Sequence, residues 1–220
     1  MSETYRILTE EAQTEIEVKR SRFIAVLKNT RTEADARAFL EEIRKANRDA
    51  RHNCSAMRIG ISRQPFERSS DDGEPQGTAG KPMLDLLKGQ DLYDVCAVTT
   101  RYFGGILLGT GGLVRAYSDA LKEALASAKT AELKSGVRVS VTCDYPISNR
   151  IRRLGELGGF FPENQVFMEQ CTFTYLMPEA AFDGFARNVT EASGGKSQAV
   201  QEAKVLYYGM EKPVVYREIP

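Results

Sequence analysis

The sequence predicts an α+β protein with two domains. Segments with the period-two alternation of strands are interleaved with segments that have the three-to-four residue spacing of amphipathic helices. This series of elements is complete near residue 134, and a second complete series follows it. With 220 residues, the chain is long enough for two small domains that each bury a core.

Composition is that of a globular protein without net charge. Hydrophobic residues make up 42% and charged residues 27% of the chain. No apolar stretch approaches the roughly 18 residues of a membrane span, and the N-terminal sequence MSETYRILTEE is acidic and lacks a hydrophobic signal core. We therefore expect a cytoplasmic protein that does not bind membranes.

The first elements are extended chain followed by a helix. Residues 14–28 alternate and are rich in β-branched and aromatic types, which predicts a strand or a strand pair. Residues 30–47 have helical spacing, and Thr32 can cap this helix together with Asp35. Its predicted apolar face consists of Ala36, Phe39, Leu40, Ile43 and Ala46.

The rest of the first domain ends in a long helix. Residues 52–61 predict a strand, and residues 69–81, dense in Gly, Pro, Ser and Asp, predict a loop. A short helix follows at 82–88. The run at 95–100 is apolar on both faces, which indicates a central strand, and residues 113–128 predict the long helix.

The second domain repeats no earlier pattern. Residues 134–136, Lys-Ser-Gly, are interpreted as an exposed link, which gives domains 1–134 and 135–220. The elements predicted after it are a strand at 137–145, a helix at 147–157, strands near 165–169 and 171–177, a helix at 179–192 and a strand at 199–209. This β-α-β-β-α-β order predicts a ferredoxin-like domain.

Cysteine spacing argues against disulfides, zinc binding and thiol catalysis. The chain has no CxxC pair and no cysteine–histidine cluster with the spacing of a zinc site. Each cysteine lies in a strand-like apolar run, so we expect buried free thiols at Cys54, Cys96, Cys143 and Cys171.

Charge is unevenly distributed along the chain. Residues 19–68 hold 13 basic and 6 acidic side chains. A basic segment in a neutral protein is a candidate surface for phosphates, because Lys and Arg neutralise them and release counterions. The alternative is an ordinary solvated surface.

A glycine-rich loop joins the central strand to the long helix. Gly109, Gly111 and Gly112 allow close backbone approach, and the amides at the helix N-terminus favour an anion. Tight packing of the loop on the sheet is the alternative. The pattern is not a dinucleotide fingerprint, because Val114 occupies the position where a third glycine is required, and Arg115 follows it.

An acidic loop precedes the short helix. Asp71, Asp72 and Glu74 could hold a hard cation such as magnesium, or these residues could simply shape turns. His52, the only histidine, has no evident nucleophile beside it. Residues 77–82 are not a P-loop, because Pro82 stands where Ser or Thr should hold magnesium.

Three long motifs resemble the IMPACT/YigZ family. They are KRSRFIA at 19–25, SDDGEPQGTAGKPML at 70–84 and VTTRYFGGILLGTGGLVRAYS at 98–118. The similarity extends over essentially the whole chain. Its acidic-loop motif includes Asp71, Asp72, Gly73, Glu74, Gly77, Thr78 and Gly80.

The resemblance implies a role in translation. It implies a first domain similar to domain IV of elongation factor G, with the ribosomal protein domain 2-like fold, and a second domain similar to that factor's C-terminal domain. Eukaryotic relatives are tied to translational control, although they carry a different additional domain. The family offers no established catalytic mechanism to place on this sequence.

Two functions follow as hypotheses. The first is a non-enzymatic protein that binds RNA, the ribosome or a translation-associated protein, without a cofactor, a metal or a dinucleotide. Phe23, Tyr102 and Phe103 are possible stacking platforms. Its predicted anion-binding residues are Lys19, Arg20, Arg22, Arg51, Arg58, Arg101, Gly109, Gly111, Gly112 and Arg115.

The second hypothesis is a metal-assisted hydrolase of a phosphorylated or peptidic substrate. Its metal would bind Asp71, Asp72 and Glu74, with His52 nearby.

Overall fold

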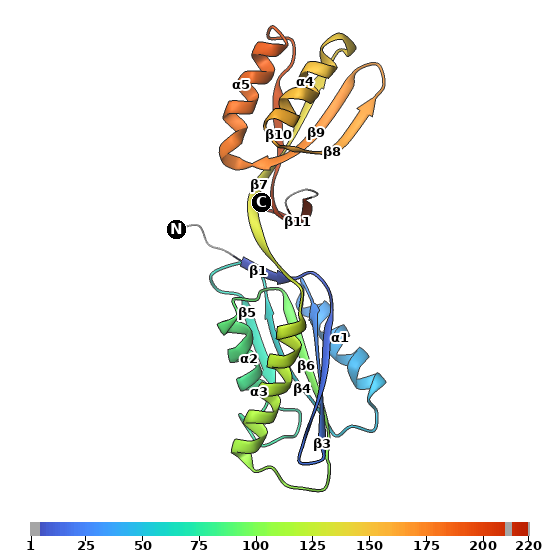
Figure 1. The fold of residues 1–220 in the computed structure, drawn as a ribbon, viewed down its shortest axis with the longest axis vertical. Coiled ribbons are helices and arrows are strands. Elements are labelled where there is room, and N and C mark those ends of the chain that lie inside the picture. The colour runs from blue at the N-terminus through green and yellow to red at the C-terminus, as the bar shows by residue number, and fades with distance from the viewer. Residues whose placement is uncertain (1–4, 210–212, 220) are drawn as a thin grey trace. The chain divides into compact units, whose positions relative to one another are not determined.

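The computed structural model describes residues 5–209 and 213–219, and the chain divides into two compact units, Met1–Glu132 and Leu133–Pro220. Both units combine helices with an antiparallel sheet (Figure 1), so the predicted mixed α+β architecture is confirmed. None of the helices in the described ranges combines the length and the apolar character needed to cross a membrane.

The first unit is built on an antiparallel sheet with the strand order β2-β3-β6-β4-β5. Its strands are β2 (Ala12–Val18), β3 (Ser21–Asn29), β4 (His52–Ile59), β5 (Phe66–Ser70) and β6 (Val95–Tyr102). The apolar run predicted to be central is β6, which lies in the middle of the sheet. A further strand, β1 (Tyr5–Leu8), leads to Thr9, whose N–H donates to the Lys129 carbonyl at 3.0 Å.

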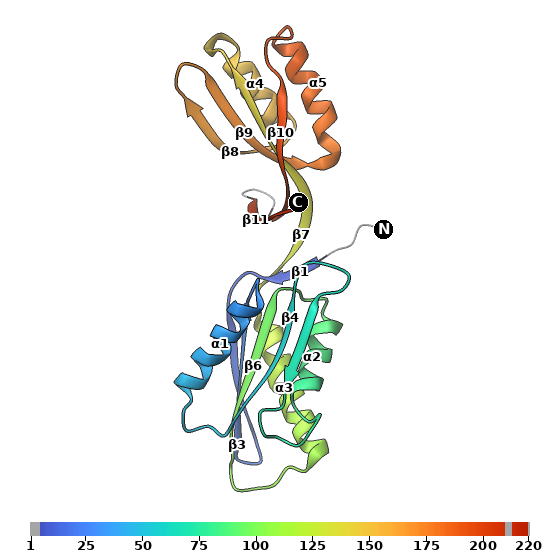
Figure 2. The same ribbon diagram turned by 180° about the vertical axis from the view of Figure 1, so that it is seen from behind.

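Helices cover both faces of this sheet. The helices α2 (Gly80–Gly89) and α3 (Thr110–Ser127) lie on one face, and α1 (Glu33–Ala46) lies on the other (Figures 1 and 2). Val95 and Ala97 of β6 pack in the core below α2 and α3, whereas Cys96 and Val98 pack below α1. This two-sided burial explains why the β6 sequence is apolar without alternation.

Local signals set the start of α1. Thr32 Oγ1 accepts from the Asp35 backbone N–H, and the Asp35 carboxylate accepts from the Thr32 N–H, both at 3.1 Å. This is the capping box that the sequence predicted.

The second unit has the predicted β-α-β-β-α-β order, followed by one more strand. Its antiparallel sheet has the order β11-β10-β7-β9-β8, and α4 and α5 pack together on it. The elements are β7 (Thr130–Cys143), α4 (Tyr145–Leu157), β8 (Phe161–Phe167), β9 (Cys171–Pro178), a 3₁₀ turn (Glu179–Ala181), α5 (Phe182–Ala192), β10 (Ala199–Tyr208) and β11 (Val214–Ile219).

The predicted link at residues 134–136 is a strand and not a loop, although Lys134 and Ser135 are exposed as expected. These residues lie inside β7, where Ser135 pairs with Leu206 of β10 and Gly136 pairs with Pro178 of β9. A Cβ at Gly136 would lie 2.6 Å from the Met177 carbonyl oxygen. The glycine therefore permits close strand packing, and the Lys-Ser-Gly composition that suggested a loop belongs to a paired strand.

Candidate functional site

Strand register brings the predicted loops to one end of the first sheet. Lys19 and Arg20 form the turn between β2 and β3, because Val18 pairs with Ser21. At the same end, Arg22 pairs with Tyr102 and His52 pairs with Arg101. We call this the motif end, defined by residues 18–22, 51–53, 71–80, 101–112 and Arg115.

A buried polar network joins the acidic loop to β6 and α3, the elements on either side of the glycine-rich loop. Glu74 Oε1 accepts from Arg101 Nη1 at 2.7 Å and from the hydroxyl of Tyr117 at 2.8 Å. The side chains of Arg101 and Glu74 are only 7% and 3% exposed. Burial raises the pKa of Tyr117, so its hydroxyl stays protonated and donates. Arg101 belongs to β6 and Tyr117 to α3, so the network ties the acidic loop to both elements that flank the glycine-rich loop.

Asp71 fixes the start of α2 from a distance. Its Oδ1 accepts from the N–H groups of Ala79 and Gly80 at 3.0 and 2.8 Å, and its Oδ2 accepts from Gly77 at 2.8 Å. Burial opposes ionisation of this carboxyl, but the three backbone donors outweigh it and lower the pKa. Asp71 is therefore a remote cap of the helix.

Asp72 ties the acidic loop to α1 and β4. Its carboxylate accepts from Arg44 Nη2 at 2.8 Å and from the Asn53 N–H at 2.7 Å. Its carbonyl oxygen lies 3.0 Å from His52 Nδ1. A carbonyl only accepts, so the hydrogen in this contact is on Nδ1.

The remaining motif residues shape this loop. Gly73 lies against the His52 ring, with a Cβ position 3.4 Å from Nδ1, and Thr78 Oγ1 donates to the Pro75 carbonyl at 2.7 Å. Gly80 is needed for close approach, because a Cβ there would lie 2.7 Å from the Ser70 backbone nitrogen. These contacts favour the turn-shaping interpretation of the loop.

The three carboxylates do not converge on one point. Asp71 contacts backbone amides, Asp72 contacts Arg44 and Asn53, and Glu74 contacts Arg101 and Tyr117. Within the described ranges, no group of three or more His, Cys, Asp or Glu side chains could hold a metal ion. The ligand set that the hydrolase hypothesis requires is therefore not assembled in this arrangement.

The glycine-rich loop begins against the β2–β3 hairpin. The Gly104 N–H donates to Ser21 Oγ at 3.1 Å, and a Cβ at Gly104 would lie 2.0 Å from the Arg20 carbonyl. Further along, Gly109 precedes α3 with a φ of 72°, and no side-chain hydrogen bond caps this helix. Added Cβ atoms at Gly109 and Gly111 would meet nothing within 4 Å, so this backbone faces open space.

Comparison with known proteins identifies the family. The profile of the Impact N-terminal domain matches residues 19–125. A Bacillus subtilis protein, IMPACT family member YvyE, is 37% identical over 214 residues, which cover 97% of each chain. The chain belongs to the IMPACT family.

Other IMPACT relatives agree over most of their length. Escherichia coli IMPACT family member YigZ is 37% identical over 190 residues, which cover 84% of this chain and 93% of YigZ. A crystal structure titled as that of a hypothetical protein has a TM-score of 0.62 and 34% identity, and covers 92% of this chain and 98% of its own. The segment that matches the Impact N-terminal domain contains the whole motif end apart from Val18.

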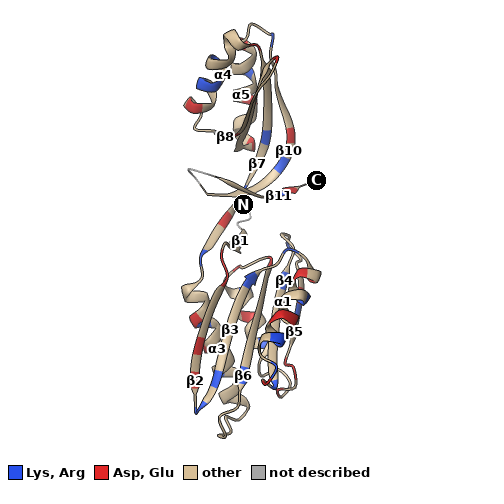
Figure 3. Ribbon diagram, turned by 90° about the vertical axis from the view of Figure 1, so that its right-hand side faces the viewer, with Lys and Arg blue, Asp and Glu red and all other residues tan. Residues whose placement is uncertain are grey.

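Several predicted cations of this IMPACT domain are exposed at the motif end. Lys19, Arg20 and Arg22 come from the hairpin, which is blue in Figure 3, and Arg51 precedes β4. Arg115 lies on the first turns of α3, where its Nε donates to the Gly111 carbonyl at 3.3 Å. Exposed cations from three separate segments are thus gathered around the two loops.

Two predicted cations are not available for phosphate contacts. Arg58 lies at the opposite end of β4, where it donates to the Leu92 carbonyl and Glu67, both at 3.2 Å, and stacks 4.0 Å from the Tyr93 ring centroid. Arg101 is buried with Glu74. Both side chains are buried and bind partners inside the protein, so their positive charges do not face an external phosphate.

Only part of the predicted aromatic platform is exposed. Phe23 is fully buried and packs edge-on against Tyr117, with ring centroids 5.1 Å apart, so its stacking role was wrong. The Tyr102 hydroxyl donates to Asn47 Oδ1 at 2.9 Å. Phe103 is 54% exposed, and Leu107 on the same loop is 82% exposed.

Sequence reasoning missed four residues that organise the site. Tyr117 lay within the predicted long helix at 113–128 without an assigned role, and Gly104 was not singled out among the glycines. Arg44 and Asn53 carried no motif signal. The paired glycines of the YFGG sequence are a signal from which a close backbone approach at Gly104 could have been predicted, but the partner is identified only by the strand register.

Proposed function

We propose that this IMPACT protein is a non-enzymatic regulator in translation that binds RNA, the ribosome or a translation-associated protein through the motif end. The observation that carries this proposal is the backbone of Lys19 and Arg20, which have φ angles of 47° and 64°. A two-residue hairpin turn with both φ angles positive favours Asn-Gly, and other residues cost about 1 kcal/mol each. The hairpin holds two cations there despite this cost.

The surroundings of the hairpin suit a polyanion. Exposed Arg22, Arg51 and Arg115 add positive charge, and the uncapped N-terminus of α3 offers backbone N–H donors. The exposed ring of Phe103 supplies a face on which a base could stack. Together these groups provide phosphate contacts and a stacking surface at one end of the sheet.

Family membership supports the setting in translation. Eukaryotic members are tied to translational control, as the motif resemblance implies. The proposed similarity of the first unit to domain IV of elongation factor G, and of the second to its C-terminal domain, would place both units among ribosome-associated folds. The proposal includes a cytoplasmic location and no cofactor.

Salt dependence of binding tests the proposal. Affinity for a labelled RNA and for ribosomes should fall steeply as salt rises, because bound cations displace counterions. Lys19→Asn with Arg20→Gly should reduce the logarithmic salt slope by about one unit per lost contact. The same double variant should raise the melting temperature, because it relieves the turn.

A matched control removes two exposed arginines of the second unit, Arg153→Gln with Arg187→Gln. This control should keep both the affinity and the slope. Binding that does not depend on salt, or no binding at low salt, would overturn the proposal. A hairpin variant that is stabilised but binds normally would assign the motif end another role.

Magnesium separates binding from metal-assisted hydrolysis. We expect Mg²⁺ to leave the melting temperature unchanged, because the three carboxylates already have protein partners. A metal site in the folded state would stabilise it by about 2.7 kcal/mol at a hundredfold excess over Kd. A rise of that kind, lost in Asp71→Asn with Asp72→Asn together with a hydrolytic activity, would favour the hydrolase.

A further inference from the structure

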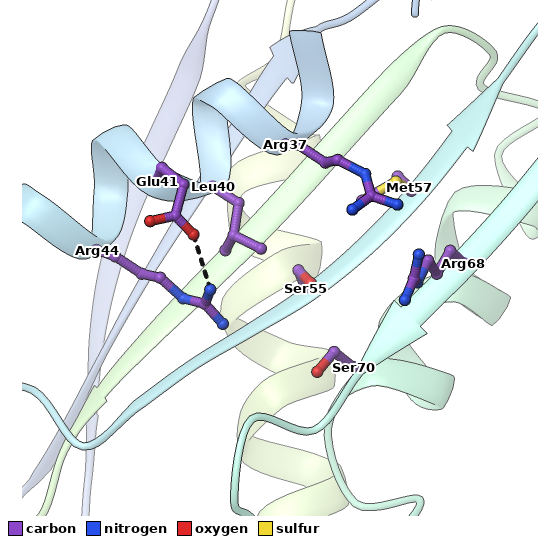
Figure 4. Close-up of a pocket in the computed structure, with 8 residues that line it drawn as sticks. All are labelled: Arg37, Leu40, Glu41, Arg44, Ser55, Met57, Arg68 and Ser70. Carbon is purple, nitrogen blue, oxygen red and sulfur yellow. Dashed lines mark hydrogen bonds and ion pairs between the residues drawn. The ribbon is translucent and has the colours of Figure 1, made fainter. Parts of the chain in front are cut away.

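A pocket outside the predicted site lies between α1 and the strands β4 and β5. Its volume is about 380 Å³, within the range of small-molecule sites. Buried Ser55 and Met57 line it on β4, and Leu40 lines it on α1 (Figure 4). The pocket thus combines an apolar wall with polar groups.

The charged groups of the pocket are mostly cationic. Arg37 and Arg44 of α1 and Arg68 of β5 line it, with Glu41 as the one lining carboxylate. In Figure 4 the three guanidinium groups surround the space above Ser55, and Glu41 lies at the edge beside Arg44. Arg44 is paired with both Glu41 and Asp72, so the guanidinium groups open to a ligand are those of Arg37 and Arg68, which favour an anion over a metal cation.

The existing partners of two of these arginines leave room for a ligand. Arg37 donates to Glu33 Oε1 from Nη2 at 2.5 Å and from Nε at 3.1 Å, and Arg68 Nη1 lies 3.5 Å from the same oxygen. The Arg37 and Arg68 side chains are 60% and 58% exposed. Ion pairs this exposed contribute little, so a ligand with more negative charge can exchange for Glu33.

We propose that this pocket binds a small phosphate monoester that carries a flat apolar group, about the size of a mononucleotide. A terminal phosphate is close to a dianion at neutral pH and accepts bidentate hydrogen bonds from guanidinium groups. The Ser55 and Ser70 hydroxyls would donate to the remaining oxygens, and Leu40 and Met57 would contact the flat group. This inference does not rest on the proposed function.

Calorimetric titration of the full chain tests the pocket with three probes. Adenosine 5′-monophosphate carries the terminal phosphate, adenosine lacks it, and the dinucleotide ApA has only an internal diester. We expect saturable one-site binding of the monophosphate, no binding of adenosine, and at least tenfold weaker binding of ApA. Absence of saturable monophosphate binding would overturn the proposal, as would equal binding of adenosine.

Variants locate the site and separate it from an RNA surface. Arg68→Gln and Arg37→Gln should each weaken the monophosphate by about tenfold, which corresponds to about 1.4 kcal/mol. Both positions are exposed, so the melting temperature should hold, and Arg187→Gln is the matched control. Unchanged affinity in both pocket variants would sink the assignment. ApA binding more tightly than the monophosphate would assign the arginines to an RNA backbone instead.

Discussion

At the residue scale, the motif end depends on one buried ion pair. The side chains of Glu74 and Arg101 are both shielded from water. The Arg101 guanidinium lies 5.6 Å from the ring centroid of Phe23 and 5.5 Å from that of Phe103. Desolvation offsets much of the attraction in such a pair. The pair therefore positions the acidic loop on β6 more than it stabilises the fold. Removing one partner should be costly mainly because the other is left buried and unpaired.

Arg101→Met should destabilise the protein by about 3–5 kcal/mol, because it leaves Glu74 buried without its cation. The double change Arg101→Met with Glu74→Leu should recover most of that loss, since no buried charge remains. Urea denaturation of the three proteins measures both effects. A single-variant loss below about 1 kcal/mol, the level of an exposed pair, would show that water reaches Glu74.

The cysteines should be inert in the folded protein. The prediction of buried free thiols is confirmed for Cys54, Cys96, Cys143 and Cys171. Burial raises the pKa of Cys54 and that of Cys96 to about 12, which leaves almost no thiolate at pH 8. A thiol reagent such as DTNB should label the native protein negligibly and label all four cysteines in denaturant. Rapid labelling of native Cys54, located by mass spectrometry, would contradict this burial.

At the scale of elements, α2 depends on a cap supplied by the preceding loop. Its own N-cap residue, Ala79, makes no side-chain hydrogen bond, and the Asp71 carboxylate accepts from the first amides instead. Sequence reasoning could identify the turn-forming composition of this loop but not its use. The acidic residues looked equally suited to a cation until their acceptor partners were placed.

Asp71→Ala should cost about 0.5–2 kcal/mol, the usual value of a helix cap. The folded pKa of Asp71 is lowered, so this stability is present above the unfolded pKa of about 3.9 and is lost as pH falls through the folded value. The difference between wild type and variant should therefore shrink below about pH 4. Asp85→Ala, which removes an exposed partner of Lys81 in the same helix, is the control. A difference that is independent of pH would exclude a charged cap.

Most elements could be predicted from periodicity, and the exceptions have physical reasons. Phe66–Ser70 was not predicted as a strand, and its last two residues were assigned to the loop at 69–81, because this edge strand is short, half exposed and followed by turn residues. Lys134–Gly136 looked like a linker because Gly and Ser are common in loops. They also occur in strands that approach closely, which is the case here. Hydrophobic periodicity shows which face of an element is buried. These two segments contain few apolar residues, so periodicity could not identify them as strands.

At the scale of the whole molecule, the sequence motifs identified the loops of the candidate site but not their common position at one end of the sheet. Arg58 and Arg101 are both arginines in apolar strands, and the register of β4 on β6 places them at opposite ends of the sheet. The same register brings His52 beside Arg101. Long-range pairing of this kind has no local signature, so the surface cations could not be separated from the buried ones in advance.

Each unit should fold without the other. The first has cores on both faces of its sheet, around Phe23 and around Phe39, and the second has its own core around Phe173. Fragments 1–132 and 133–220 should therefore each give a cooperative calorimetric transition. The first fragment should keep the salt-dependent binding of the full chain and the second should lack it, because the exposed cations of the motif end belong to the first. If fragment 1–132 is unfolded at 25 °C while the full chain is folded, the two units form one cooperative structure.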